Sequence, residues 1–169
     1  MIRSATLRPL AWCALPAVAG ILALSLSGRA ADLVLINESP SLPKGLYVRT
    51  LGASPARGAI VALAQPEAVR PYLSRLGMPS DVRLIKRVAG MPGDPVCARN
   101  ERLLVGSRDL PVLADDRRGA ALPRWSGCRA LRADEYFLLG DTPTSFDSRY
   151  FGPANRADLI GVYRSLLTW

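Results

Sequence analysis

The sequence predicts a mostly β protein, an antiparallel β-sheet domain behind one N-terminal transmembrane helix. After residue 31, short apolar runs rich in Val, Ile and Leu are separated by Gly and Pro turns, as in antiparallel sheets. Before it, Pro9–Gly28 is a stretch of 20 uncharged, mostly apolar residues, the length that a helix needs to cross a bilayer. The 169 residues therefore divide into a cytoplasmic stub and anchor over residues 1–30 and one domain over residues 31–169.

The charges that flank the apolar stretch orient the anchor. Arg3 and Arg8 precede it, whereas Arg29 follows it and Asp32 comes soon after, so the positive-inside bias favours a cytoplasmic N-terminus. The domain would then lie outside the cytoplasm. The alternative is a signal peptide cleaved within residues 28–31, although the apolar stretch is longer than usual and an arginine inside the cleavage motif is unfavourable. We therefore expect the anchor to be retained.

Seven strands, one helix and one insert are expected after the anchor. The strands are Leu33–Ile36, Leu46–Thr50, Ala59–Ala64, Val82–Val88, Glu101–Val105, Tyr136–Leu139 and Ile160–Leu166. Glu67–Leu76 has helical spacing, and Pro71 must start a new turn or bend the helix. Residues 94–134 are richer in Arg, Asp, Gly and Pro, so we expect loops and short strands carried on the main sheet, with a small insert over about residues 95–134.

The composition limits the chemistry. With no histidine, the chain cannot use Ser-His-Asp or Cys-His catalysis, and it lacks the imidazole on which catalytic zinc sites rely. Of the 22 basic residues, 20 are arginines, which stay protonated at any workable pH. A nitrogen base must then be Lys44, Lys86 or the terminal amine. We expect neither a metal ion nor another cofactor.

The charge and the cysteines indicate partners and compartment. The net charge is +8, of which +5 is scattered over residues 32–169 without a basic stripe interleaved with aromatic residues. A lipid bilayer rather than a nucleic acid is therefore the expected partner. Cys13 lies within the apolar stretch as a packing residue. Cys97 and Cys128 are left as an even pair, which either forms a disulfide in an oxidising compartment or stays as two buried thiols.

The first of three segments that carry chemistry contains two serines. Ser39 and Ser41 flank Pro40, and a second proline and a glycine follow. Prolines fix the backbone, so a hydroxyl here could be held rigidly. Ser41 is 13 residues past Gly28, which keeps it within ~43 Å of the anchor. The alternative interpretation is a plain turn between two strands.

The second segment centres on Lys86. Strand alternation puts Lys86 and Leu84 on one face. Burial among Leu84, Ile85 and Val88 would lower the pKa of the amine from ~10.4. A neutral amine can take a proton from a serine, whereas an ammonium cannot. The alternative is a lysine that extends from a strand edge into solvent.

The third segment, residues 140–153, gathers hydroxyl groups, two carboxylates and a guanidinium in a loop after an apolar strand. Asp147 and Arg149 could pair with each other or with Lys86. Ser145 could donate a hydrogen bond that orients a neutral amine. The alternative is a polar turn in which Asp147 and Arg149 only hold the shape of the loop.

Together the three segments resemble the type I signal peptidase (leader peptidase) family. The most specific matches are IKRVAGMPGD at residues 85–94 and SFDSRYFG at residues 145–152, behind an anchor and a Ser-x-Ser element. Within the family, SPSLPKGLY at residues 39–47 is most similar to the TraF-type branch of conjugative-transfer peptidases, because Leu42 and Pro43 directly follow the second serine. The compact insert suits that smaller branch as well.

The resemblance implies a fold of the signal-peptidase type and a Ser-Lys dyad. It implies that Ser41 is the nucleophile, that Lys86 is its general base, and that Asp147 is catalytically important. The hydroxyl of Ser39 would join the backbone N–H of Ser41 in an oxyanion hole. Ser145 would orient the lysine. The residues that shape the site would be Ser145, Arg149, Gly140 and Asp141.

The expected function is that of a membrane-anchored serine endopeptidase, single-pass in the bacterial inner (cytoplasmic) membrane, with its catalytic domain in the periplasm. Its substrate would be an exported precursor protein, in particular a conjugative pilin, and the conjugative transfer apparatus would be a partner. Whether water or an amine resolves the acyl-enzyme, giving cleavage or cyclisation, stays open. One alternative is a general type I signal peptidase for many secreted proteins, and another is a non-catalytic, membrane-anchored assembly partner.

Overall fold

The computed structural model describes residues 32–169. The chain divides into two compact units, Met1–Leu35 and Ile36–Trp169. The predicted anchor Pro9–Gly28, the alternative cleavage site at residues 28–31 and Cys13 lie outside the described residues. Within the described part of the chain, no helix is both long enough and apolar enough to cross a membrane.

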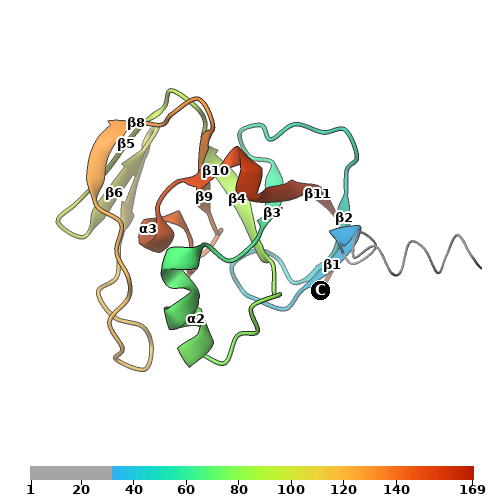
Figure 1. Ribbon diagram of the computed structural model, residues 1–169, viewed down its shortest axis with the longest axis horizontal. Coiled ribbons are helices and arrows are strands. Elements are labelled where there is room, and N and C mark those ends of the chain that lie inside the picture. Colours follow the sequence, from blue (N-terminus) through green and yellow to red (C-terminus); the bar gives the residue numbers. More distant parts are fainter. Residues whose placement is uncertain (1–31) are drawn as a thin grey trace, which may run out of the picture. The chain divides into compact units, whose positions relative to one another are not determined.

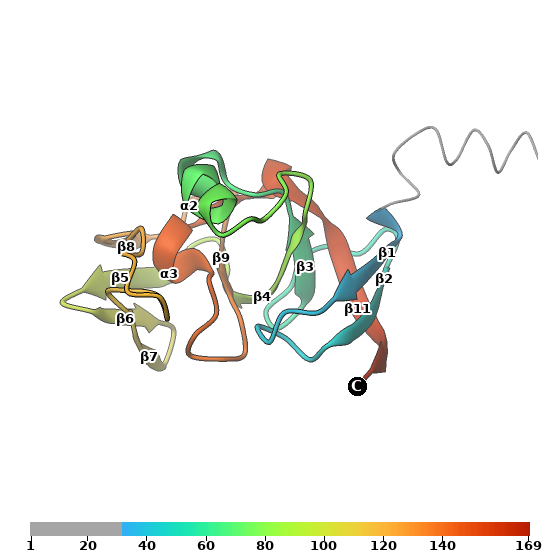
Figure 2. The same cartoon turned by 90° about the horizontal axis from the view of Figure 1, so that it is seen from below.

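The predicted antiparallel β fold is confirmed in the second unit. β1 (Val34–Asn37) spans the boundary between the units, and the main sheet continues in the order β2-β11-β3-β4-β9-β10 (Figures 1 and 2). All neighbouring pairs from β2 to β10 are antiparallel. These strands are β2 (Gly45–Arg49), β3 (Ile60–Leu63), β4 (Leu84–Gly90), β9 (Glu135–Leu139), β10 (Ala154–Asn155) and β11 (Leu159–Thr168).

β9 contributes to both hydrophobic cores. All of its residues are buried, so both of its faces are covered. Tyr136 and Leu138 pack in one core, while Phe137 and Leu139 pack in the other, because successive side chains of a strand point to opposite faces. β9 ends directly before Gly140. The third segment of the sequence therefore starts from a strand that is fixed on both sides.

Residues 94–134 contain the expected short strands, but these strands form a sheet of their own, which was not predicted. The four strands are antiparallel in the order β7-β6-β5-β8, and only β6 was predicted. Buried side chains of the second sheet, such as Val96 and Leu103, share a core with Phe137 and Leu139 of β9, so the second sheet packs against the main one. The strands are β5 (Pro95–Arg99), β6 (Arg102–Val105), β7 (Arg108–Pro111) and β8 (Gly127–Ala130).

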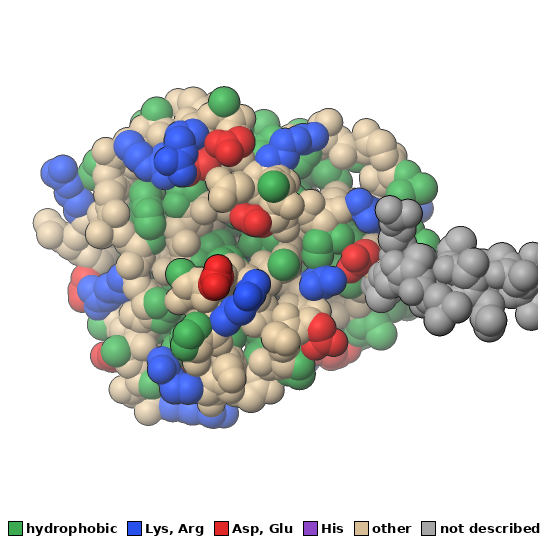
Figure 3. Space-filling view, in the orientation of Figure 1, with side chains coloured by type: hydrophobic (Ala, Val, Ile, Leu, Met, Phe, Trp, Pro, Cys, Tyr) green, Lys and Arg blue, Asp and Glu red, His purple; other side chains and the backbone are tan. Residues whose placement is uncertain are grey.

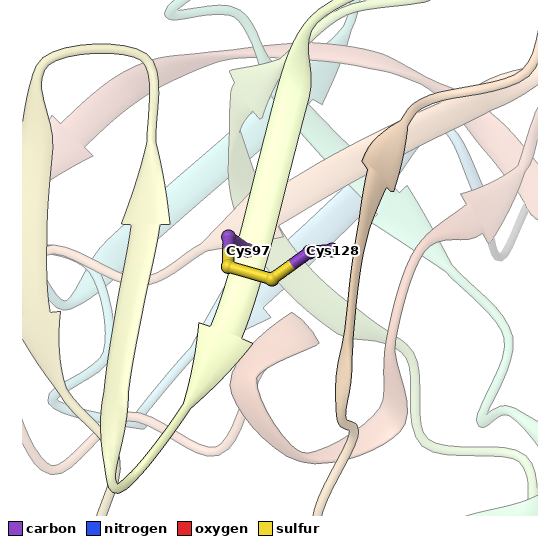
Figure 4. Close-up of a disulfide and its surroundings, with 2 residues drawn as sticks. All are labelled: Cys97 and Cys128. Carbon is purple, nitrogen blue, oxygen red and sulfur yellow. A yellow bond between two sulfur atoms is a disulfide. The ribbon is translucent and has the colours of Figure 1, made fainter.

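Cys97 and Cys128 form a disulfide within the second sheet (Figure 4). They are direct partners in the register of β5 and β8, and 31 positions separate them in the sequence. Of the two alternatives for this pair of cysteines, the structure therefore has the disulfide. The bond closes the part of the chain that runs from β5 through β7 to β8.

A helix lies where the sequence predicts one. A 3-10 turn (Glu67–Val69) is followed by α2 (Arg70–Arg75). Pro71 lies in the first turn of α2, where its missing N–H removes no helical hydrogen bond, so it starts the helix. Tyr72 and Leu73 are buried in the same core as Leu138, which fixes α2 against the main sheet.

Three short elements were not predicted, because two to four residues are too few to show a periodic pattern. They are α3 (Ser148–Phe151), β10 and a 3-10 turn (Arg156–Asp158). The carboxylate of Asp147 caps α3 by accepting the backbone N–H of Arg149. This cap ends the loop that begins at Gly140.

We expect the disulfide to stabilise the folded protein by about 3 kcal/mol, because it restricts the unfolded chain. The Cys97→Ser/Cys128→Ser double variant of the full chain in detergent should therefore unfold at a lower urea concentration, followed by tryptophan fluorescence. A thiol reductant should lower the midpoint of the wild type to that of the double variant and leave the variant unchanged. Equal midpoints for the oxidised wild type and the variant would contradict this role.

Candidate active site

The loop between β1 and β2 carries Ser41, and Asn37 holds the shape of this loop. The side-chain amide of Asn37 donates to the carbonyl oxygens of Ser39, Leu42 and Pro43 at 3.0, 3.1 and 3.1 Å. Its side-chain oxygen accepts the backbone N–H of Ser39 at 3.2 Å. The backbone around Ser41 is therefore fixed from one buried side chain.

Lys86 lies beside Ser41. Its Nζ is 3.0 Å from the Oγ of Ser41, a hydrogen-bond distance, and it also donates to the carbonyl oxygen of Ile85 at 3.0 Å. Lys86 belongs to β4, which pairs with β3 on one side and β9 on the other. Ser41 and Lys86 are each 4% exposed. The amine therefore points into the protein rather than from a strand edge into solvent.

Burial changes the protonation of Lys86. Removal of the ammonium from water lowers the pKa of Lys86 to about 8, from the ordinary value of 10.5. The carboxylate of Asp147 acts in the opposite direction, and the guanidinium of Arg149 acts in the same direction. The neutral amine is therefore abundant at mildly alkaline pH, and it has the lone pair that an ammonium lacks.

The hydroxyl of Ser39 lies against Ser41. Its Oγ accepts the backbone N–H of Ser41 at 3.2 Å and donates to the Oγ of Ser41 at 3.0 Å. The Ser41 hydroxyl thus has the Ser39 hydroxyl and the Lys86 amine as its two neighbours. Because a hydroxyl hydrogen rotates, the proton of Ser41 can point to Lys86 when the amine is neutral.

Asp147 and Arg149 form a buried pair. Hydrogen bonds of 2.8 and 2.7 Å join the guanidinium to the carboxylate, and their side chains are 2% and 0% exposed for Arg149 and Asp147. Burial opposes the charge of Arg149, but its hydrogen bonds to Asp147 prevail and raise the pKa of Arg149, so it stays a cation. Of the pairings that the sequence left open, the described part of the chain has Asp147 with Arg149 and no ion pair with Lys86.

The same pair fixes the backbone of the loop. The carboxylate of Asp147 accepts the backbone N–H of Gly140 at 2.9 Å. The guanidinium of Arg149 donates to three backbone carbonyl oxygens at 3.1, 2.8 and 3.1 Å, which belong to Thr142, Pro143 and Ser145. The conformation of residues 140–149 therefore depends on this one pair of side chains.

Gly140 allows Ser145 to approach Ser41. A Cβ atom on Gly140 would overlap the Oγ of Ser145 and lie 2.8 Å from the carbonyl oxygen of Ser41. Ser145 is 3% exposed, and among the described residues its Oγ has no hydrogen-bond partner. The hydrogen bond expected from Ser145 to the amine of Lys86 is therefore not formed, since that amine bonds to Ser41 and to the carbonyl oxygen of Ile85 instead.

Asp141 shapes the site mainly through its backbone. Its N–H donates to the carbonyl oxygen of Ser41 at 2.6 Å, which joins the third segment of the sequence to the loop that carries Ser41. Its carboxylate accepts two hydrogen bonds of 2.9 Å from the guanidinium of Arg87 on β4. Asp141 thereby ties both segments to the strand that carries the lysine.

The Ser41 and Lys86 side chains lie at a cavity of about 720 Å³. Ser41, Lys86 and Ser145 line it together with apolar side chains of α2, of β4 and of the segment after β7. This volume is within the range of ligand-binding cavities, and the lining suits the apolar side chains of a peptide. Across residues 32–169, no three His, Cys, Asp or Glu side chains are grouped so that they could hold a metal ion.

Three residues that organise the site were not predicted from the sequence: Asn37, Arg87 and Phe146. The ring of Phe146 stacks on Tyr72 of α2 and on Tyr150 of α3, with 5.1 and 5.3 Å between ring centroids. The spacing of four positions between Phe146 and Tyr150 in SFDSRYF was a signal for the contact between these two rings. Nothing local in the sequence links Asn37 to the carbonyl groups that it binds.

Comparisons with known proteins identify the family. The family model described as signal peptidase, peptidase S26 matches residues 10–169. A plasmid transfer protein TraF from Escherichia coli is 36% identical over 168 residues, which cover 90% of this chain and 94% of that protein. A conjugal transfer protein TraF from Agrobacterium tumefaciens (strain 15955) is 32% identical over 79% of this chain and 82% of that protein.

Signal peptidases also match the chain. Signal peptidase I V from Bacillus subtilis (strain 168) is 32% identical over 47% of this chain and 54% of that protein. The crystal structure of a signal peptidase I from Enterococcus faecalis V583 matches with a TM-score of 0.39 and 26% identity, over 65% of this chain and 97% of that one. The resemblance to signal peptidases and to TraF proteins is thus confirmed. Because the family model matches nearly the whole chain and a relative of similar length is 36% identical, the protein belongs to the signal peptidase family, peptidase S26.

Proposed function

We propose that the protein is a serine endopeptidase in which Ser41 is the nucleophile and Lys86 is the general base. The observation that carries this proposal is the 3.0 Å separation between the Nζ of Lys86 and the Oγ of Ser41, in a cavity large enough for a peptide. Membership of the signal peptidase family supports serine peptidase chemistry. The lowered pKa of Lys86 supports its role as a base.

The first half of the reaction follows from the positions of donors and acceptors. Lys86 accepts the hydroxyl proton of Ser41 as Oγ forms a bond to the carbonyl carbon of the peptide. The carbonyl oxygen becomes an oxyanion. The backbone N–H of Ser41 and the hydroxyl of Ser39, which in the free protein bond to Ser39 Oγ and Ser41 Oγ, turn to this oxyanion, and each donor contributes on the order of 3 kcal/mol. The Lys86 ammonium then gives its proton to the leaving amine nitrogen as the peptide bond breaks, and an ester remains on Ser41.

The second half releases the product. Water attacks the ester while Lys86, neutral again, accepts its proton, and the result is cleavage. An amine of the substrate itself would instead form a new amide bond, and the result is a cyclic product. Asp147 and Arg149 hold the loop in place, and Ser145, whose hydroxyl has no partner among the described residues, orients the lysine amine once Ser41 has been acylated.

The substrate that we propose is an exported precursor protein of the pilin kind. The relatives named for plasmid transfer and conjugal transfer support a place beside a conjugative transfer apparatus. An exported precursor is processed outside the cytoplasm. In this proposal residues 1–30 anchor the protein in the inner membrane, and the catalytic domain lies in the periplasm. The 32% identity to a signal peptidase I from Bacillus subtilis supports a second candidate, a general signal peptidase for many secreted proteins.

Two experiments test the proposal. Mass spectrometry of a candidate pilin precursor incubated with the protein reports the cleavage site and any cyclisation together. Rescue of a strain depleted of its own signal peptidase would favour the general enzyme, whereas precursor cleavage without rescue would favour the dedicated one. A folded wild type that cleaves neither the precursor nor any peptide of a randomised library would be a non-catalytic assembly partner.

Replacing either member of the dyad should abolish cleavage without unfolding the protein. We expect Ser41→Ala and Lys86→Met to lower kcat by at least about 10³-fold, because each removes the covalent route. Lys86→Arg should be as inactive, since a guanidinium stays protonated.

Lys44→Met is the matched control, because the Lys44 side chain is 48% exposed and lies 3.9 Å from a carboxylate oxygen of Glu38. It should cleave the precursor as the wild type does. Wild-type turnover by a dyad variant with a native circular dichroism spectrum would refute the assignment.

The pH profile should report the amine of Lys86. Only the neutral amine accepts a proton and its pKa in the free protein is about 8, so kcat/KM should rise through pH 8 and level off above it. From about pH 7 to about pH 9 the neutral fraction, and with it kcat/KM, grows about tenfold. The measurement is kcat/KM for a fluorogenic peptide at concentrations well below KM, because this constant reports the free protein. A flat profile over this range would argue against Lys86 as the base.

Gly140→Ala should displace Ser145 and Ser41. The added Cβ would overlap the hydroxyl of Ser145 and approach the carbonyl oxygen of Ser41, neither of which lies at the end of a long flexible side chain. We expect about 2 kcal/mol of lost stability and at least about a tenfold loss of kcat. In the control Gly161→Ala, the nearest neighbours of the added Cβ are atoms of the flexible Arg49 side chain, so stability and kcat should change little. Equal behaviour of the two variants would contradict the close approach at Gly140.

A further inference from the structure

The segment between β7 and β8 forms one wall of the cavity that holds the dyad. Residues 113–122 of this segment, the wall hairpin, fold back on themselves: Asp115 and Ala121 form an antiparallel bridge, and the N–H of Asp116 donates to the carbonyl oxygen of Ala120 at 2.8 Å. The two ends of the wall hairpin and its tip all line the cavity. In Figure 1 the segment after β7 runs beside α2.

The carboxylate of Asp116 fixes the tip of the wall hairpin. One oxygen accepts the backbone N–H groups of Arg118 and Ala120 at 2.8 and 2.9 Å. The other oxygen accepts the hydroxyl of Tyr72 on α2 at 3.0 Å. The tip is therefore shaped internally and tied to a helix that forms another wall of the same cavity.

Two further contacts join the wall hairpin to the loop that carries Ser145. The N–H of Leu113 donates to the hydroxyl of Tyr150, whose ring stacks on Phe146. The guanidinium of Arg117 donates to the hydroxyl of Thr144 at 3.5 Å. The tip is thus bonded to Thr144, the residue directly before Ser145.

The tip contributes two arginines to the lining of the cavity. Arg117 and Arg118 are exposed and line the same cavity as the dyad. Within residues 32–169 neither guanidinium lies within ion-pair distance of a carboxylate, although the charge of Arg118 helps to lower the pKa of Asp116. Asp115 is the other carboxylate that the wall hairpin contributes to the lining. On the face shown in Figure 3, basic and acidic side chains are interspersed over much of the surface.

We propose that Arg117 and Arg118 select peptides that carry a carboxylate side chain near the scissile bond. This inference rests on the proposed peptidase function. Guanidinium groups held on a tethered hairpin are preorganised donors for a carboxylate, because the hairpin loses little freedom on binding. An anionic lipid headgroup would attract the same groups, but the two arginines line the cavity that contains the nucleophile, and this position favours the peptide.

Peptide cleavage by the full-length protein in a neutral detergent tests the selection. Mass spectrometry of a cleaved randomised peptide library first locates the scissile bond. Peptides that differ only by Asp, Ala or Lys at each flanking position are then compared by kcat/KM. The wild type should prefer Asp to Ala about fivefold at one or more positions, and Lys should be the poorest. Equal kcat/KM for the three peptides at every position would overturn the proposal.

Variants of the tip assign the preference to these residues. R117E/R118E should reverse the order of the Asp and Lys peptides, and R117A/R118A should bring the two close together. Y72F keeps its ring in the aromatic stack but loses the hydroxyl that ties down the tip, so its preference for Asp should weaken without reversing. Arg164→Glu, an exposed position on β11 that does not line the cavity, is the matched control and should keep the wild-type preference. An Asp preference that survives in R117E/R118E would overturn the proposal.

The two proposals fail in different ways. Absence of any cleavage by the wild type would overturn both, whereas cleavage with no dependence on peptide charge would overturn only the role of the arginines. Phosphatidylglycerol vesicles test the lipid alternative. If R117E/R118E lost binding to these vesicles while its peptide preference stayed that of the wild type, the arginines would contact lipid, and the selection of acidic peptides would be wrong.

Discussion

The separation of the Lys86 amine from water is the constraint on which the site depends. Lys86 lies within the main sheet, opposite Val61 of β3, and only 4% of it is exposed. A charged amine in such a place is unfavourable, and loss of a proton relieves that cost. The packing that destabilises the ammonium is therefore also what supplies a base. The proposed chemistry needs no histidine, because the fold lowers the pKa of an amine into the range where it can accept a proton.

A second buried charge positions the groups around that amine. The Asp147/Arg149 pair is excluded from solvent, and burial of two charges is favourable only when their hydrogen-bonding groups have partners. Here the carboxylate accepts backbone N–H groups at both ends of the loop, while the guanidinium donates to carbonyl oxygens between them. Removal of either member would leave the other charge buried and the loop unsupported. The loop in turn positions Ser41, because the N–H of Asp141 donates to the carbonyl oxygen of Ser41.

Much of the main sheet was predictable, because strands such as Tyr136–Leu139 are continuous apolar runs between turn residues. The composition singles out Lys86 as a candidate base, since the chain has only two lysines and no histidine. In the second sheet only β6 was located from the sequence, and β7 and β8 were missed because they are mostly exposed and show little alternation. Two features of the site depend on tertiary positions that no local sequence pattern indicates. One is the set of hydrogen bonds from Asn37 to the loop that carries Ser41, and the other is the lack of a partner for the Ser145 hydroxyl within the described residues.

The protonation of Lys86 can be measured without catalysis, because the sequence contains only one other lysine. In the Lys44→Arg variant, Lys86 is the sole lysine, so lysine labelled with carbon-13 at Cε gives one resonance that needs no further assignment. Its chemical shift, followed by nuclear magnetic resonance as the pH is raised, reports the loss of the proton from Nζ. A midpoint near pH 8 is the result expected of a buried base. A midpoint near the ordinary 10.5 would contradict the central claim, since an amine that stays protonated cannot activate Ser41.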